Sequence, residues 1–189
     1  MDRRGHFPQS HCHNDGAVRR VFRAIQSGYC RDATTQGTFR RLCETGGSSM
    51  DVRIKTFREA MDSFSYLARL DVAELKHKLG DERLVDGMQN GRAQKFEYTT
   101  ELCWKAIKFF LKEKDGVDES APKKIFKAYY LGGYSTEDDY MLLVEAVEDR
   151  NRLSHMYDAT TFNDILTRLP AYAALFERVC AQLVETAST

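Results

Sequence analysis

The sequence predicts an all-α protein, an up-and-down four-helix bundle with one short extra helix. Two observations carry this prediction. Long segments have apolar residues at every third or fourth position, as amphipathic helices do, and the 189 residues contain only three prolines, which leaves room for long helices. No segment shows the apolar–polar alternation of a strand. Short polar connections favour antiparallel helices packed as neighbours.

The first two helices are predicted over residues 52–79 and about 82–114. In the first, apolar residues step by three and four until Gly80-Asp81 ends the pattern. In the second, Gly87 and Gly91 weaken the early part, so a break there stays open. Beyond them the apolar face is wide, which predicts a central helix that is covered on more than one side.

Three further helices follow. A short one begins around Pro122, which suits a first turn, and ends at Gly132-Gly133. Ser135-x-x-Asp138 is typical of a capping box and predicts the start of the fourth long pattern. The last helix, with Asp158 or Thr160 as its cap, reaches about residue 185.

Charge and composition divide the chain near Met50. Residues 1–49 contain eight arginines, no lysine and four acids, a net charge of +4, while residues 50–189 contain 20 basic and 24 acidic residues, a net charge of −4. The first segment is poor in apolar residues and rich in glycine, so we expect residues 1–49 to be a disordered extension, or the result of a misassigned start site. Residues 50–189 are the predicted helical domain.

Composition also excludes several classes of protein. No apolar run approaches the ~20 residues that span a bilayer, so no membrane partner is expected. The five cysteines are odd in number and irregularly spaced, which favours reduced thiols and a cytoplasmic location. The histidines and cysteines of the first segment fit no closed zinc pattern, so no metal site is predicted there; they are His11, Cys12, His13, Cys30 and Cys43.

The most informative stretch is residues 149–158, DRNRLSHMYD. It continues the helical stripe of Tyr140, Leu143, Val144 and Val147, but places polar residues where apolar ones are expected. Polar groups on a buried face are costly unless they are paired. A local rule broken in this way is expected at a functional site.

The spacing Arg150-Asn151-x-x-x-His155-x-Tyr157 resembles the signature of the HEPN superfamily, and within it the nucleotidyltransferase substrate-binding proteins. The aromatic-rich run 95–113 is similar to the second helix of that family, and the resemblance covers roughly residues 51–183. It implies a HEPN-like bundle, a homodimer and a separate minimal nucleotidyltransferase as partner. Gly47-Ser48 is not followed by the metal-binding acidic pair of such enzymes, so this chain is not expected to be the nucleotidyltransferase itself.

The motif residues suit phosphate chemistry. Arg150 offers a permanent charge and a planar fork for phosphate, and His155 can exchange a proton near neutral pH. Asn151, four residues before His155, can orient the imidazole, and Ser154 is a second supporting residue. The resemblance implies that Arg150 and His155 cleave RNA without a metal or other cofactor, and that the partner can silence the nuclease by transferring AMP to Tyr157.

Two functions of different classes therefore remain open. The first is an RNA-cleaving toxin of a toxin–antitoxin pair, neutralised by its nucleotidyltransferase. The second is a non-catalytic subunit that presents substrate to that nucleotidyltransferase. The net charge of −4 in residues 50–189 is not typical of a strong general RNA binder, so the association with a nucleotidyltransferase is the firmer expectation.

Overall fold

The computed structural model describes residues 49–154 and 158–187, and within them it contains helices and no strand. The all-helical class predicted from the sequence is confirmed for these residues. None of these helices is long and apolar enough to cross a membrane. Residues 1–48 of the predicted extension, with its histidines and cysteines, lie outside the described residues, and Ser49 is the first residue of the first described helix. The helices are α3 (Ser49–Ala68), α4 (Val72–Leu79), α5 (Glu82–Asp115), α6 (Pro122–Leu131), α7 (Glu137–Leu153) and α8 (Ala159–Ala187).

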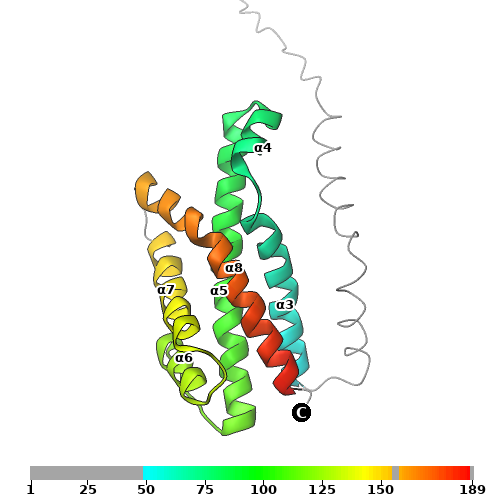
Figure 1. Ribbon diagram of the computed structural model, residues 1–189, viewed down its shortest axis with the longest axis vertical. Helices are drawn as coiled ribbons and strands as arrows, with labels where there is room; N and C mark the ends of the chain where they lie inside the picture. The colour runs from blue at the N-terminus through cyan, green and yellow to red at the C-terminus, as the bar shows by residue number, and fades with distance from the viewer. Residues whose placement is uncertain (1–48, 155–157, 188–189) are drawn as a thin grey trace, which may run out of the picture. The chain divides into compact units, whose positions relative to one another are not determined.

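Helix α5 is the centre of the arrangement, because it contacts each of the other described helices. Figure 1 shows α3 on one side of α5 and α6 and α7 on the other, with α8 running obliquely across them. This position explains the wide apolar face that the sequence shows in this segment. The prediction of a central helix covered on several sides is confirmed.

Aromatic side chains join α3, α5 and α8. The ring of Phe96 on α5 lies 5.8 Å from that of Phe64, 5.0 Å from that of Tyr172 and 6.5 Å from that of Phe176, measured between centroids. All four side chains are buried. Since burying one such side chain contributes about 1.5–3 kcal/mol, this cluster is a principal source of stability.

The helix predicted over residues 52–79 is in fact two helices, and this prediction was wrong. The chain leaves the helix after Ala68 and begins α4 at Val72. Asp71 has extended backbone angles, and its carboxylate accepts hydrogen bonds from the backbone N–H groups of Ala73 (2.9 Å) and Glu74 (3.1 Å). An Asp that caps a new helix in this way satisfies donors that a continuous helix would have used, so it favours the break.

Helix α5, by contrast, passes Gly87 and Gly91 without a break. The buried residues Val85 and Arg92 lie on either side of them, and α5 packs against α3 and α4 in this region. Tertiary contacts therefore outweigh the weak helix propensity of glycine.

The later helix ends follow the predicted signals closely. Helix α6 is followed by Gly132-Gly133, and Asp158 accepts hydrogen bonds from the first N–H groups of α8, as predicted. The cap of α7 is one residue later than predicted, because the Thr136 hydroxyl accepts from the N–H of Asp139 (3.1 Å). Helix α8 continues through Pro170 and changes direction along its length (Figure 1).

Candidate functional site

Arg150 and Asn151, in the last turn of α7, line a surface pocket of about 410 Å³. We call it the Arg150 pocket. Its walls come from three helices, α5, α6 and α7, and its volume lies within the range of about 300–1,000 Å³ found for small-molecule sites. The other lining residues are Thr100, Glu101, Trp104, Ala121, Pro122, Lys123 and Val147.

Two of the three guanidinium nitrogens of Arg150 have a partner, and the third has none among the described residues. Its Nη1 donates to Asn151 Oδ1 (3.1 Å), and its Nη2 lies 3.7 Å from Glu101 Oε2. Its Nε is buried and has no hydrogen-bond partner among the described residues. Since arginine carries five N–H donors, the side chain is oriented by the protein and still has a donor to offer.

A second polar group of the pocket, in the wall formed by α5, is also unpaired. Thr100 is only 1% exposed, and its hydroxyl has no hydrogen-bond partner in the part of the chain that the structure describes. A buried polar group without a partner costs about 1–3 kcal/mol. Such groups are rare in native proteins and call for an explanation. Arg150 Nε and the Thr100 hydroxyl are thus two groups of this pocket that a bound ligand or an ordered water would satisfy.

Glu101 organises the aromatic side of the pocket. Trp104 Nε1 donates to Glu101 Oε2 (3.0 Å), and Lys105 lies 2.8 Å from Glu101 Oε1 and 5.5 Å from the centroid of the Trp104 ring. Burial pushes the pKa of Glu101 up, but the hydrogen bonds from Lys105 and Trp104 and the charge of Arg150 outweigh it and lower the pKa. Glu101 is therefore ionised at neutral pH, and it holds the indole in place.

The third wall is the N-terminus of α6. Ala121 occupies the capping position, where it provides no side-chain hydrogen bond, and Pro122 follows in the first turn. The positive end of the helix dipole therefore has no side-chain cap at the pocket. Lys123 adds a charge, which is paired with Glu148 (2.7 Å). Arg150, the uncapped helix end and the aromatic ring together suit an anionic ligand with a planar group.

Comparison with known protein families gives a decisive match. The family described as nucleotidyltransferase substrate binding protein like matches residues 52–185, which is most of the chain. The chain belongs to this family.

One solved structure is similar to this chain in both sequence and fold. It is a crystal structure of a protein from Thermus thermophilus, with 29% sequence identity and a TM-score of 0.58. The alignment covers 67% of this chain and 98% of the Thermus protein. No curated protein matches the chain.

The residues predicted to form the site are brought together only in part within the described residues. Arg150 and Asn151 contact each other and the pocket. Ser154 is exposed, and its hydroxyl donates to Glu97 Oε1 on α5 (3.0 Å), outside the pocket lining. Asn151 is also exposed and not on a buried stripe. His155 and Tyr157, the predicted proton carrier and modification site, lie outside the described residues.

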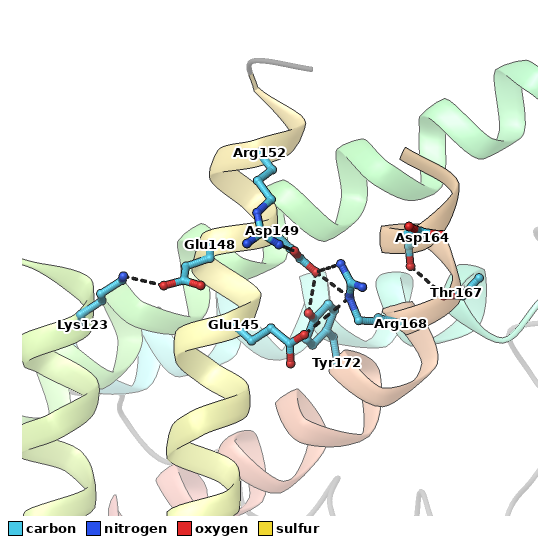
Figure 2. Close-up of polar contacts among 9 residues, drawn as sticks. All are labelled: Lys123, Glu145, Glu148, Asp149, Arg152, Asp164, Thr167, Arg168 and Tyr172. Carbon is cyan, nitrogen blue, oxygen red and sulfur yellow. Dashed lines mark hydrogen bonds and ion pairs between the residues drawn. The ribbon is translucent and has the colours of Figure 1, made fainter. Parts of the chain in front are cut away.

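The sequence reasoning missed the buried member of this motif, Asp149. It is 0% exposed and accepts hydrogen bonds from Tyr172 (2.7 Å), Arg168 Nε (2.8 Å) and Arg152 Nη1 (3.0 Å). Figure 2 shows these groups converging on the carboxylate from α7 and α8. Burial and the bond to Asp149 raise the pKa of Tyr172, so its hydroxyl stays protonated as a donor. Asp149 thus connects the end of α7, which carries Arg150, to α8 through hydrogen bonds.

Thr100 and Trp104 were also missed as site residues. The sequence placed both in the central helix, where a threonine and a tryptophan are ordinary. They lie far from the motif in the sequence, so no local pattern indicates that they share a pocket with Arg150. The lysines on one face of the same helix are paired with acids of this chain: Lys105 with Glu101, and Lys108 and Lys112 with Asp118.

Proposed function

We propose that this protein is the substrate-binding subunit of a two-component nucleotidyltransferase, and that the Arg150 pocket holds a phosphate-bearing substrate for that enzyme. The family description supports the first half of the proposal. The observation that carries the second is that Arg150 Nε and the Thr100 hydroxyl are both buried and unpaired in one pocket. The catalytic nucleotidyltransferase is a separate protein, and we place the pair in the cytoplasm.

Each wall of the pocket would contribute one part of recognition. Arg150 binds the phosphate through its charged N–H groups, and the N-terminus of α6 adds the positive end of its helix dipole. Trp104 provides an aromatic surface for a planar base, and Thr100 donates to an oxygen of the ligand. Glu101 lines the site, and Glu148 pairs with the lining residue Lys123, so each further phosphate adds repulsion. We therefore expect a monophosphate to bind more tightly than a triphosphate.

Binding of adenosine 5′-monophosphate to the full chain tests this proposal. Isothermal titration should detect binding that is weaker for ATP and weaker still for adenosine. Arg150→Ala should reduce the affinity for the monophosphate about 10–100-fold, since a charge-assisted hydrogen bond contributes about 1.5–3 kcal/mol. Arg83→Ala is the matched control, because Arg83 is exposed and is not part of the pocket. Equal affinity for adenosine and its monophosphate would refute the phosphate site.

A second candidate function is metal-independent cleavage of RNA by a HEPN-like helical bundle. It is favoured by the position of Arg150, which lines a pocket at the end of α7, one turn before His155 in the sequence. In this proposal Arg150 stabilises the charge on phosphorus while His155 moves the proton, with Asn151 and Ser154 as supporting residues. A homodimer would bring two motifs together, so that one imidazole serves as base and the other as acid.

In that second function the protein is the toxin of a toxin–antitoxin pair. The partner nucleotidyltransferase would neutralise it by transferring AMP to Tyr157, where the added phosphate would compete for Arg150. Intact mass of the protein co-expressed with its partner measures this directly. Added AMP on the wild type and none on Tyr157→Phe supports the modification, and an unchanged mass of the wild type argues against it.

Expression in bacteria separates the two functions. The full chain is compared with its Arg150→Ala and His155→Ala variants for growth and for RNA fragments that end in a cyclic phosphate. Arrest by the wild type alone selects the ribonuclease. Indifference of the cells to all three, together with monophosphate binding by the wild type, selects the substrate-binding subunit. The same assays on a Met50–Thr189 form test the proposal that residues 50–189 are the functional domain.

A further inference from the structure

A second pocket, of about 350 Å³, lies between the α6–α7 connection, the start of α7 and the last part of α8. We call it the Tyr129 pocket. It shares no lining residue with the Arg150 pocket. Its volume is at the small end of the range for ligand sites, about 300–1,000 Å³. Its lining includes Tyr129, Ser135, Asp139, Arg178, Val179 and Gln182.

Tyr129 carries an unpaired hydroxyl in this pocket. The side chain is 0% exposed, and its hydroxyl has no hydrogen-bond partner among the described residues. Its ring is stacked on Tyr134, with centroids 5.5 Å apart, and meets the edge of Phe110 at 6.2 Å. These contacts pack the ring among other aromatic side chains. Burial raises the pKa of Tyr129, with the nearby Cys103 and Asp139 adding to the effect, so the hydroxyl keeps its proton.

A second unpaired hydroxyl lies in the same wall. Ser135 Oγ is buried and has no hydrogen-bond partner in the described part of the chain. The neighbouring polar groups, in contrast, are satisfied: the Thr136 hydroxyl accepts from the N–H of Asp139 (3.1 Å), and the Tyr134 hydroxyl donates to Asp115 (3.0 Å). Nearly all buried polar groups in native proteins are hydrogen-bonded. The Tyr129 and Ser135 hydroxyls are therefore the two groups of this pocket that a ligand or an ordered water would satisfy.

The charges of the pocket cancel. Arg178 Nη2 donates to Asp139 Oδ1 (2.6 Å), and Arg178 Nε donates to the same oxygen (3.2 Å). The third nitrogen of the guanidinium, Nη1, donates to the carbonyl of Ala174 (3.1 Å). An anion would have to compete with Asp139 for Arg178, and a cation would have to compete with Arg178 for Asp139. An uncharged ligand avoids both costs.

We propose that the Tyr129 pocket binds a small uncharged molecule rich in hydroxyl groups, of about the size of a pentose, and that Tyr129 and Ser135 recognise it. Each of the two hydroxyls can donate and accept a hydrogen bond, which matches a ligand whose own hydroxyls do both. Val179 and the tyrosine rings provide an apolar wall for the carbon skeleton. The amide of Gln182 adds a further polar group at this wall. This site does not depend on the function proposed for the Arg150 pocket.

Titration of the full chain with D-ribose, followed by amide NMR, tests the proposal. We expect saturable shifts of the Gly133, Ser135 and Thr136 amides, at least tenfold weaker binding for Tyr129→Phe, and a smaller loss for Ser135→Ala. Tyr66→Phe is the matched control, because Tyr66 is exposed and does not line the pocket. Inorganic phosphate should leave these amides unshifted.

Two results would overturn the proposal. One concerns binding: the wild type shows no saturable shifts with ribose, or Tyr129→Phe binds ribose with the same affinity as the wild type. The other concerns stability without ribose. If the hydroxyl of Tyr129 is unpaired until a ligand arrives, Tyr129→Phe should melt at the same temperature as the wild type or higher. A clear fall in melting temperature would mean that the hydroxyl is already bonded, for example to ordered water, and that the pocket is structural.

Discussion

At the scale of single residues, the position of Arg150 depends on its neighbour Asp149. The Asp149 carboxylate is fully buried, yet Arg168 and Arg152, which donate to it, reach the surface. The carboxylate thus connects the last turns of α7 to α8 (Figure 2), while Arg150, the next residue, lines the pocket. A buried charge of this kind is tolerated only because it is hydrogen-bonded by several donors.

Replacing Asp149 by alanine is expected to lower the free energy of unfolding by about 1–3 kcal/mol, because the buried hydroxyl of Tyr172 loses its acceptor. Urea unfolding measures the loss. Glu148→Gln is the control on the same helix, since its partner Lys123 is exposed, and it should change little. Equal effects of the two substitutions would contradict the role given to Asp149.

Two adjacent threonines of α5 provide a sharper test at the same scale. Thr99 and Thr100 are both buried, but the Thr99 hydroxyl donates to the carbonyl of Lys95 (2.7 Å), whereas the Thr100 hydroxyl is unpaired among the described residues. Thr99→Val should therefore destabilise by about 0.5–1.5 kcal/mol, while Thr100→Val should be neutral or stabilising and should weaken monophosphate binding. Thermal unfolding and titration of the two variants check this. If Thr100→Val is as destabilising as Thr99→Val, the hydroxyl is already satisfied without a ligand.

At the scale of the helices, the end of α3 is set by a residue of another helix. Arg92 on α5 is buried, and it donates from Nε to the carbonyl of Leu67 and from Nη2 to that of Ala68, both at 3.0 Å. These are carbonyls of the last turn of α3, which have no partner within their own helix. Arg92 therefore performs the task that a glycine cap performs at the ends of α4 and α5.

Arg92→Lys should lower the free energy of unfolding by about 1–3 kcal/mol, although the charge is kept. A lysine has a single nitrogen and cannot reproduce the planar fork that reaches two carbonyls. Arg83→Lys, on the exposed start of α5, should have no measurable effect. Amide hydrogen exchange in the last turn of α3 should be faster in Arg92→Lys than in the wild type. Unaltered exchange there would show that Arg92 does not stabilise this helix end.

At the scale of the whole helical unit, a surface ion pair connects elements far apart in the sequence. Arg69, just after α3, donates from Nη1 and Nη2 to the two carboxylate oxygens of Glu177 on α8, at 2.7 and 2.8 Å. The hydrogen bonds from Arg69 lower the pKa of Glu177 below its ordinary value of 4.5, although burial opposes them. The carboxylate thus binds a proton less readily in the folded protein than in the unfolded chain, so stability falls as the pH falls.

The contribution of this pair should be complete above about pH 4.5 and should be lost as the pH falls through the lowered pKa of Glu177. At neutral pH, Glu177→Gln should reduce the free energy of unfolding by about 0.5–1 kcal/mol, a small value because both side chains are substantially exposed. Urea unfolding of the wild type and the variant at about pH 7 and about pH 3.5 measures both effects. If the wild type and Glu177→Gln differ in free energy of unfolding by the same amount at both pH values, the pH dependence does not come from Glu177.

Much of the helical layout could be predicted from local pattern. Apolar spacing and the capping signals at Gly132-Gly133 and Asp158 were sufficient for α6 and the start of α8, because the groups that satisfy a helix end lie within a few residues of it. The same spacing led to the wrong prediction of one continuous helix where the chain forms α3 and α4. There the apolar repeat continues across the break, and the carbonyls at the end of α3 are satisfied by Arg92, 24 residues further along from Ala68.

The sequence by itself determined that the protein is helical and that residues 149–158 depart from the helical pattern, since both are properties of neighbouring residues. Only the tertiary structure decided which polar groups are buried and which are unpaired. Thr100, Trp104 and Arg150 share a pocket because α5 and α7 pack side by side, and Asp149 rather than Asn151 is the buried polar residue of the motif. Burial and hydrogen-bond satisfaction depend on what other helices bring close, and that information is not local in the chain.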